Sequence, residues 1–263
     1  MNVLENLLYL EGNDIIMNKK CINIIFVCII LAVTVPVYGQ TAEEFNDTGV
    51  LFSQMGLYEL SLGLFDEAIR LRPNWYVPYF NRALAHRDNG NHNLAINDYT
   101  SALNLEKNTA IIYISRGISF IQRGNFRQAI QDLTDAIRLE NNNSQAYFNR
   151  AFAYRREGLN ALAIEDYLRA ISIDPDLTEG YYNLGNIYNS IGEYDNAISN
   201  YTIAIRLSPN EFAYHFNRGN AHARKGDYNN AITDYNTTLR LNPGHNGAMN
   251  AKEEVLRLQA LTQ

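Results

Sequence analysis

Four arginines in this chain are each followed, at the same distance along the sequence, by an aspartate. The pairs are Arg82 with Asp98, Arg116 with Asp132, Arg150 with Asp166, and Arg218 with Asp234. A planar guanidinium can form two parallel hydrogen bonds with one carboxylate, so this combination favours ion pairing. The sequence therefore predicts four Arg–Asp pairs. They act either as clamps on a ligand or as links that hold two segments of the chain together.

The other reactive side chains do not form a catalytic or metal-binding pattern. The five histidines are scattered, and no set of His, Cys and carboxylate residues has the spacing of metal ligands. The sequence contains no nucleophile–base pair and no phosphate-binding loop. The net charge is −6 and no basic stripe is present, which argues against nucleic-acid binding. We expect a protein that is not an enzyme, uses no cofactor or metal, and binds no nucleic acid.

The Arg–Asp pairs belong to a repeat of 34 residues that occurs six times without a gap. Successive copies begin, for example, at residue 76 and at residue 110. The copies cover 42–75, 76–109, 110–143, 144–177, 178–211 and 212–245. Small residues recur at the eighth, twentieth and twenty-seventh places, and a glycine stands at the fifteenth. Apolar residues follow helical spacing on both sides of that glycine, which suits a helix end. Each copy is therefore expected to form two helices joined by a turn.

This pattern resembles the tetratricopeptide repeat over residues 42–245. The resemblance implies an all-α, right-handed superhelical solenoid of six helix-turn-helix units, in which the first helix of each unit lines a concave groove. Residues 246–263 carry apolar side chains on one helical face and are expected to form a capping helix over the last unit. The resemblance also implies that the groove holds other proteins or peptides.

The Arg–Asp pairs place a constraint on how each unit closes. The arginine stands in the first helix of a copy and the aspartate in the second. The fifth copy lacks both partners, with Leu184 and Asn200 at these places. The joint loss favours direct contact between the two helices, and a half-buried contact of this kind would fix the geometry of the hairpin. A role in gripping a ligand is the alternative.

The sixth place of the repeat carries a polar side chain that is expected to line the groove. The asparagines at this place are Asn81, Asn149, Asn183 and Asn217. They resemble the asparagine ladder with which the superhelix of O-GlcNAc transferase grips peptide backbone. An amide both donates and accepts hydrogen bonds, so it can pair with the main chain of any sequence. The alternative is that these asparagines serve local packing.

Other places expected to face the groove carry large apolar side chains. They are Phe80, Leu84, Ile114, Ile118, Phe148, Phe152, Tyr182 and Phe216. Contiguous exposed apolar patches mark interaction sites, and we expect Phe148 and Ile114 at the accessible centre of this one. Its flanking residues Arg87, Arg155 and Arg156 favour a partner with apolar anchors and acidic flanks. The alternative is that tight packing of the superhelix covers the stripe.

The N-terminal segment differs from the repeats. Lys19 and Lys20 precede an apolar run, and the small residue Gly39 stands before Gln40. This pattern predicts a secretory signal peptide at 17–39 with cleavage near Gly39, and residues 1–16 are interpreted as an over-extended start. Both cysteines lie inside the predicted signal, so the mature chain would contain no disulfide. An uncleaved membrane anchor is the alternative.

These features together predict a non-enzymatic scaffold or adaptor. We expect it to be periplasmic or secreted and to bind a peptide or protein partner in its concave groove. The alternative is a membrane-anchored structural or assembly subunit of an envelope complex. In that case the chain would contact the membrane only through its uncleaved N-terminal segment.

Overall fold

A computed structural model describes residues 8–11, 14–17 and 41–261 of the 263-residue chain. The predicted signal peptide, apart from Met17, lies outside these residues, as does its cleavage point. The chain divides into two compact units, Met1–Pro73 and Asn74–Gln263.

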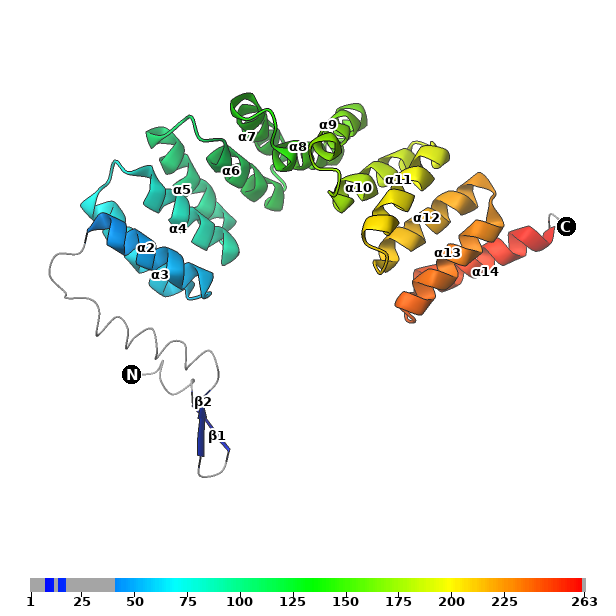
Figure 1. The fold of residues 1–263 in the computed structure, drawn as a ribbon, viewed down its shortest axis with the longest axis horizontal. Helices are drawn as coiled ribbons and strands as arrows, with labels where there is room; N and C mark the ends of the chain where they lie inside the picture. The colour runs from blue at the N-terminus through cyan, green and yellow to red at the C-terminus, as the bar shows by residue number, and fades with distance from the viewer. Residues whose placement is uncertain (1–7, 12–13, 18–40, 262–263) are drawn as a thin grey trace. The chain divides into compact units, whose positions relative to one another are not determined.

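The first unit contains two short strands and the first repeat (Figure 1). Strands β1 (Leu8–Glu11) and β2 (Asp14–Met17) pair in antiparallel register and were not among the predicted elements. The repeat forms helices α2 (Ala42–Gln54) and α3 (Tyr58–Leu71). Thr41 and Glu44 satisfy each other's backbone N–H groups in a capping box, which explains where α2 begins.

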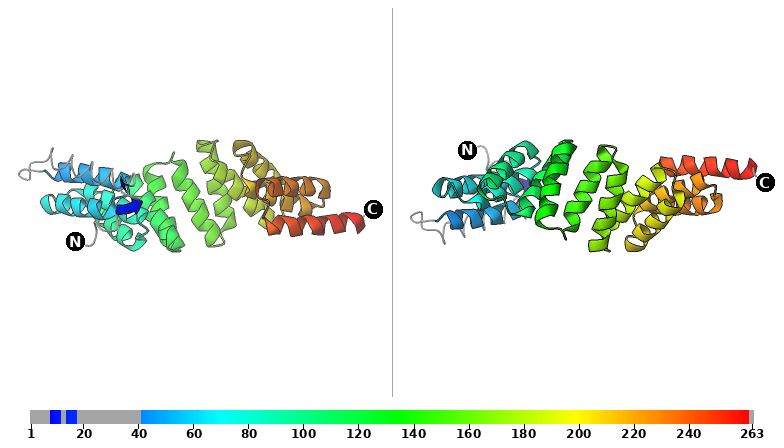
Figure 2. Two further views of the ribbon diagram at one scale, coloured as in Figure 1. Left: turned by 90° about the horizontal axis from the view of Figure 1, so that it is seen from below. Right: turned by 90° about the horizontal axis from the view of Figure 1, so that it is seen from above.

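The second unit contains the remaining five repeats and the capping helix, which follow one another in chain order (Figures 1 and 2). Its helices are α4 (Tyr76–Asp88), α5 (His92–Leu105), α6 (Ala110–Gln122), α7 (Phe126–Leu139), α8 (Ser144–Arg156), α9 (Asn160–Ile173), α10 (Thr178–Ser190), α11 (Tyr194–Leu207), α12 (Phe212–Lys225), α13 (Tyr228–Leu241) and α14 (Asn246–Leu261). Between residues 41 and 261 there is no strand. The predicted all-α solenoid of helical hairpins is therefore confirmed.

Glycine and other small residues make these hairpins possible. The glycine at the fifteenth place of every copy has φ between 75° and 86°, a conformation in which a side chain is strained. At the eighth place the two helices of a hairpin approach closely. A Cβ on Gly185 would lie 2.6 Å from the ring of Tyr201, so glycine is needed here for the tyrosine ring to pack against the first helix.

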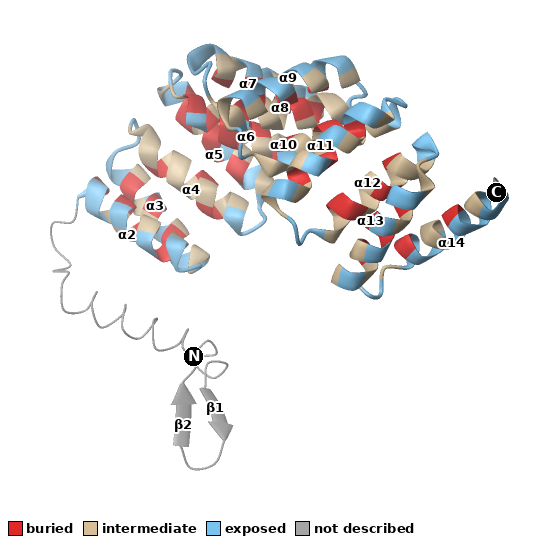
Figure 3. Cartoon of the chain, turned by 45° about the vertical axis from the view of Figure 1, so that its right-hand side comes forward, coloured by how far each residue is buried: buried red, intermediate tan, exposed pale blue. Residues whose placement is uncertain are grey.

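Buried residues gather where helices of a hairpin and of neighbouring hairpins face each other (Figure 3). The capping helix α14 continues this core, because Ala248 and Val255 pack with Ala231 and Tyr235 of α13. Leu258, near the end of α14, is 37% exposed.

Candidate functional site

All four predicted Arg–Asp pairs form, and each joins the first helix of a hairpin to the second. The guanidinium donates Nε–H to one carboxylate oxygen and Nη2–H to the other, with N–O distances between 2.6 and 2.9 Å. The aspartate side chains are 10% exposed or less. Burial raises the pKa of Asp132 above its ordinary value, although the hydrogen bonds and charge of Arg116 oppose this. The pairs are therefore internal links and not clamps on a ligand.

Three of these arginines also reach the preceding hairpin. Their Nη1–H donates to a threonine hydroxyl: Arg116 to Thr100 at 2.9 Å, Arg150 to Thr134 at 3.0 Å and Arg218 to Thr202 at 3.0 Å. Each arginine thus ties two hairpins together. The sequence contains a pattern that indicates these contacts. Within the second unit, every copy that precedes a pairing arginine has a threonine at the place of Thr100.

The joint between the fourth and fifth hairpins lacks this link. Leu168 replaces the threonine, and Leu184, which is fully buried, replaces the arginine. The two first helices are connected instead by Arg155, whose Nη1–H donates to Asn183 Oδ1 at 3.1 Å. This joint is therefore held by a contact at the groove itself.

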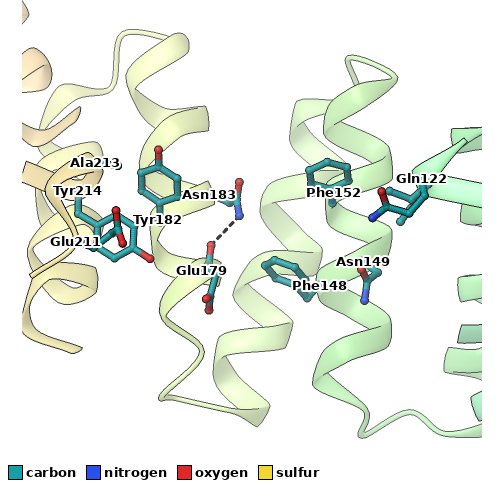
Figure 4. A pocket seen from close by; sticks show the side chains of 11 residues that line it. Gln122, Phe148, Asn149, Phe152, Glu179, Tyr182, Asn183, Glu211, Ala213 and Tyr214 are labelled. Atoms are coloured by element: carbon teal, nitrogen blue, oxygen red, sulfur yellow. Dashed lines mark hydrogen bonds between the residues drawn. The ribbon is translucent and has the colours of Figure 1, made fainter. Parts of the chain in front are cut away.

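A pocket of about 460 Å³ opens at this joint, among the first helices α6, α8, α10 and α12 (Figure 4). Its lining residues are Ile121, Gln122, Phe148, Asn149, Phe152, Glu179, Tyr182, Asn183, Glu211, Ala213 and Tyr214. The predicted groove residues that it brings together are Phe148, Phe152, Tyr182, Asn149 and Asn183. The predicted residues that do not line it are Phe80, Leu84, Ile114, Ile118, Phe216, Asn81 and Asn217.

Sequence reasoning missed the acidic side of this pocket. Glu179 stands at the second place of the repeat in the fifth copy. Glu211 stands immediately before α12 and Tyr214 lies in its first turn. The residues at the starts of the first helices therefore also line the groove. Their position in the repeat is the sequence feature that could have identified Glu179, Glu211 and Tyr214.

The apolar stripe lies between the groove and the core. At the fifth place of the repeat, the aromatic rings are half-buried and pack against a tyrosine of their own hairpin, as Phe148 does against Tyr167 at a centroid distance of 5.5 Å. The prediction that Ile114 forms an accessible centre is wrong. Ile114 is only 1% exposed. The reason is that its hairpin has Leu133 in place of the tyrosine, and the short isoleucine packs fully against this leucine. Phe148 lines the pocket and also packs against the core cluster of its hairpin.

Phe152 differs from the other stripe residues. It is half-buried and lines the pocket, and within the second unit as described it is not part of a hydrophobic core cluster. The guanidinium of Arg156 lies 5.9 Å from the centroid of its ring. Phe152 is therefore the aromatic residue of the groove that can be changed with least effect on the core.

The asparagines of the ladder are partly engaged within the chain. Asn149 and Asn183 each donate one amide hydrogen to the backbone carbonyl oxygen four residues earlier, at 2.8 Å. Asn217 donates to the hydroxyl of Tyr182 at 2.8 Å, and Asn81 is half-buried on α4. The two amides in the pocket thus keep a second N–H group for a ligand.

The arginines that flank the stripe also have contacts within the chain. Arg87 pairs with its neighbour Asp88 at 2.8 Å. Arg155 donates to the groove amide described above, and the guanidinium of Arg156, which is exposed, lies 4.7 Å from the ring centroid of Phe126. Arg155 and Arg156 contact neutral groups, so their positive charge is not neutralised by a carboxylate within residues 41–261.

No group of three or more His, Cys, Asp or Glu side chains in the described ranges is arranged to hold a metal ion. None of the helices from α2 to α14 combines the length and the apolarity needed to cross a bilayer.

Comparison with solved structures places the fold among known proteins. PilF of Pseudomonas aeruginosa superimposes with a TM-score of 0.70 at 16% identity, over 81% of this chain and 97% of that one. YrrB, described as a TPR protein with an unusual peptide-binding site, has a TM-score of 0.64 at 22% identity, over 72% and 97% of the two chains. MamA has a TM-score of 0.60 at 25% identity, over 63% and 91%.

Sequence comparison agrees with this fold. Family models described as TPR repeat match residues 153–189 and 185–226, and models described as tetratricopeptide repeat match 77–109 and 212–245. A search among curated proteins finds no match. The matched segments lie within the second unit and consist of its helical hairpins, and none of the matching families is catalytic. The chain therefore belongs to the tetratricopeptide-repeat family.

Proposed function

We propose that this protein is a non-enzymatic scaffold or adaptor that binds a peptide segment of a partner protein in the groove of its second unit, centred on the pocket among α8, α10 and α12. One observation carries the proposal: large apolar side chains and two amides with spare donors share one pocket. An extended peptide offers both apolar side chains and unpaired backbone groups. The same fold occurs in YrrB, a protein described by its peptide-binding site.

Three aromatic rings would supply most of the binding energy. Phe148, Phe152 and Tyr182 are half-buried in the free protein, so each has ring surface left to bury. Phe148 is held by Tyr167 and Tyr182 by Tyr214, the latter at a centroid distance of 4.7 Å. Aromatic rings that are fixed before binding lose little entropy on contact and are frequent hot spots. Apolar anchors on the partner fit this surface.

Acidic flanks on the partner fit the last turn of α8. Arg155 and Arg156 lie there, and neither is paired with a carboxylate within the described residues. A partner carboxylate would gain a charged hydrogen bond without displacing an internal ion pair. Arg87, which already pairs with Asp88, would contribute less.

We also propose that binding takes place outside the cytoplasm. This rests on the basic and apolar residues of 17–39 and the small Gly39. N-terminal sequencing of the protein from its native cell tests it. A mature chain that begins near Gln40 supports export. A chain that retains 17–39 and fractionates with membranes favours the anchored assembly subunit.

The groove is tested by comparing two substitutions of the same type. Phe152→Asp places a charge in the pocket, and Leu162→Asp places one on α9, where Leu162 is 42% exposed. Full-length tagged protein captures its partners from native envelope fractions, and mass spectrometry identifies them. We expect Phe152→Asp to lose partners that the wild type and Leu162→Asp both retain, at similar melting temperatures. Equal capture by both variants would place binding outside the groove.

A further inference from the structure

We infer that the pocket receives a basic side chain, lysine or arginine, from the bound segment, with Glu179 and Glu211 as its anionic partners. This inference rests on the proposed function, because it names the chemistry of one anchor in the same groove. The two glutamates lie at the start of α10 and immediately before α12, and both line the pocket (Figure 4).

The two carboxylates are not used by the fold. Glu211 occupies the N-cap position of α12, where Ser, Thr, Asp and Asn are preferred, and its side chain makes no capping hydrogen bond. Glu179 lies in the first turn of α10, and its backbone carbonyl, not its carboxylate, accepts from Asn183. Neither glutamate forms an ion pair with a base among residues 41–261. Two negative charges therefore stand at the pocket without internal compensation.

Tyr214 supplies a third, independent acceptor. Its side chain is 8% exposed, it lines the pocket, and its hydroxyl makes no hydrogen bond within the described part of the chain. Burial raises the pKa of Tyr214, and the negative charges of Glu179 and Glu211 raise it further. Glu179, Glu211 and Tyr214 thus line one pocket with three side-chain acceptors, and an ammonium group has three donors.

The walls of the pocket suit the stem of a basic side chain. Phe148 and Phe152 stand across the pocket from Tyr182 and Tyr214 (Figure 4). Lysine and arginine pack their methylene groups against apolar surface and place their charge over aromatic rings. The chain makes such a contact itself, where Arg156 approaches a ring to 4.7 Å. An acidic side chain would meet repulsion from both glutamates.

The charges also give the bound segment a direction. Figure 4 shows Phe148 and Glu179 toward one end of the pocket, and Phe152 and Asn183 toward the other. Arg155, which contacts Asn183, lies at that second end. The basic anchor would therefore lie near the start of α10, and the acidic flank would lie beyond Phe152.

The test uses short capped peptides with a shared frame of leucine and asparagine. They differ at one central position, which is lysine, arginine, norleucine or glutamate. Fluorescence anisotropy measures their binding to the full chain. We expect lysine to bind about twofold to fivefold more tightly than norleucine, the range for a charged pair at exposed glutamates. The preference should disappear in Glu179→Gln/Glu211→Gln and persist in Glu165→Gln, which changes an exposed glutamate on α9.

The outcomes separate this inference from the proposed function. Equal binding of lysine and norleucine peptides, with both lost in Phe152→Asp, would overturn the basic anchor and leave groove binding intact. A lysine preference that survives the double glutamine variant would also overturn it. Binding that is insensitive to Phe152→Asp, or no binding by any peptide, would contradict both. Melting temperatures of all variants confirm that the comparison is made between folded proteins.

Discussion

Replacing Arg150 with alanine removes three hydrogen bonds at once and leaves Asp166 as a buried carboxylate without its base. The lost bonds run from Nε and Nη2 to the two carboxylate oxygens, at 2.7 and 2.9 Å, and from Nη1 to Thr134 at 3.0 Å. The arginine and aspartate side chains are 15% and 6% exposed. We therefore expect the free energy of unfolding to fall by about 3 kcal/mol, the lower end of the range for breaking a buried pair.

The pairing energy is separated from the burial cost by a double-mutant cycle. Asp166→Ala should cost less than Arg150→Ala, about 2 kcal/mol, because the guanidinium is more exposed and keeps its bond to Thr134. The double variant leaves no unpaired charge and should cost about 3 kcal/mol. The coupling energy of the pair is then about 2 kcal/mol, within the range for contacting residues.

Urea unfolding followed by circular dichroism measures all three variants, with Arg138→Ala as the matched control. Arg138 forms an exposed ion pair with Asp135 one helical turn away, and its side chain is 74% exposed. Its loss should cost less than about 1 kcal/mol. The reasoning is refuted if Arg150→Ala costs no more than Arg138→Ala, or if the coupling energy is below about 0.5 kcal/mol.

Two further pairs of variants test the packing of the hairpins by the same unfolding assay. Tyr201→Phe should cost about 1 kcal/mol, because its hydroxyl donates to Asn186 Oδ1 at 2.8 Å, whereas Tyr167→Phe should cost nearly nothing, because its buried hydroxyl has no partner within the described residues; equal costs would contradict this. Gly185→Ala should destabilise by about 1–3 kcal/mol, since its Cβ would lie 2.6 Å from the Tyr201 ring, whereas Gly63→Ala, with open space around it in a helix, should stabilise by about 0.5–1 kcal/mol. A stable Gly185→Ala protein would show that the ring can move.

Features that depend on spacing within one copy were predictable from the sequence. The glycine of each turn, the small residue opposite a large one, and the Arg–Asp pair recur at fixed places, and the structure contains all of them. The hydrogen bond from Arg150 to Thr134 crosses between copies. It was equally predictable, because the threonine and the arginine are present or absent together in neighbouring copies of the second unit.

The pocket could not be predicted in the same way. It needs residues from several hairpins, and it opens at the joint where Leu168 and Leu184 replace the link found elsewhere. Its acidic side comes from Glu179 and Glu211, which lie at the starts of α10 and α12, the first helices of two neighbouring hairpins. Its shape therefore depends on how neighbouring hairpins are spaced.

The sequence by itself determined the fold class, the hairpin boundaries and the direction in which each repeat place points. Only the tertiary structure decided how exposed each place is. Ile114 and Phe148 occupy the same place, yet the first is fully buried and the second reaches the pocket. The physical reason is that the repeat fixes the direction of a side chain. Its exposure depends on the size of that side chain and of the one it meets, Leu133 in one hairpin and Tyr167 in the other.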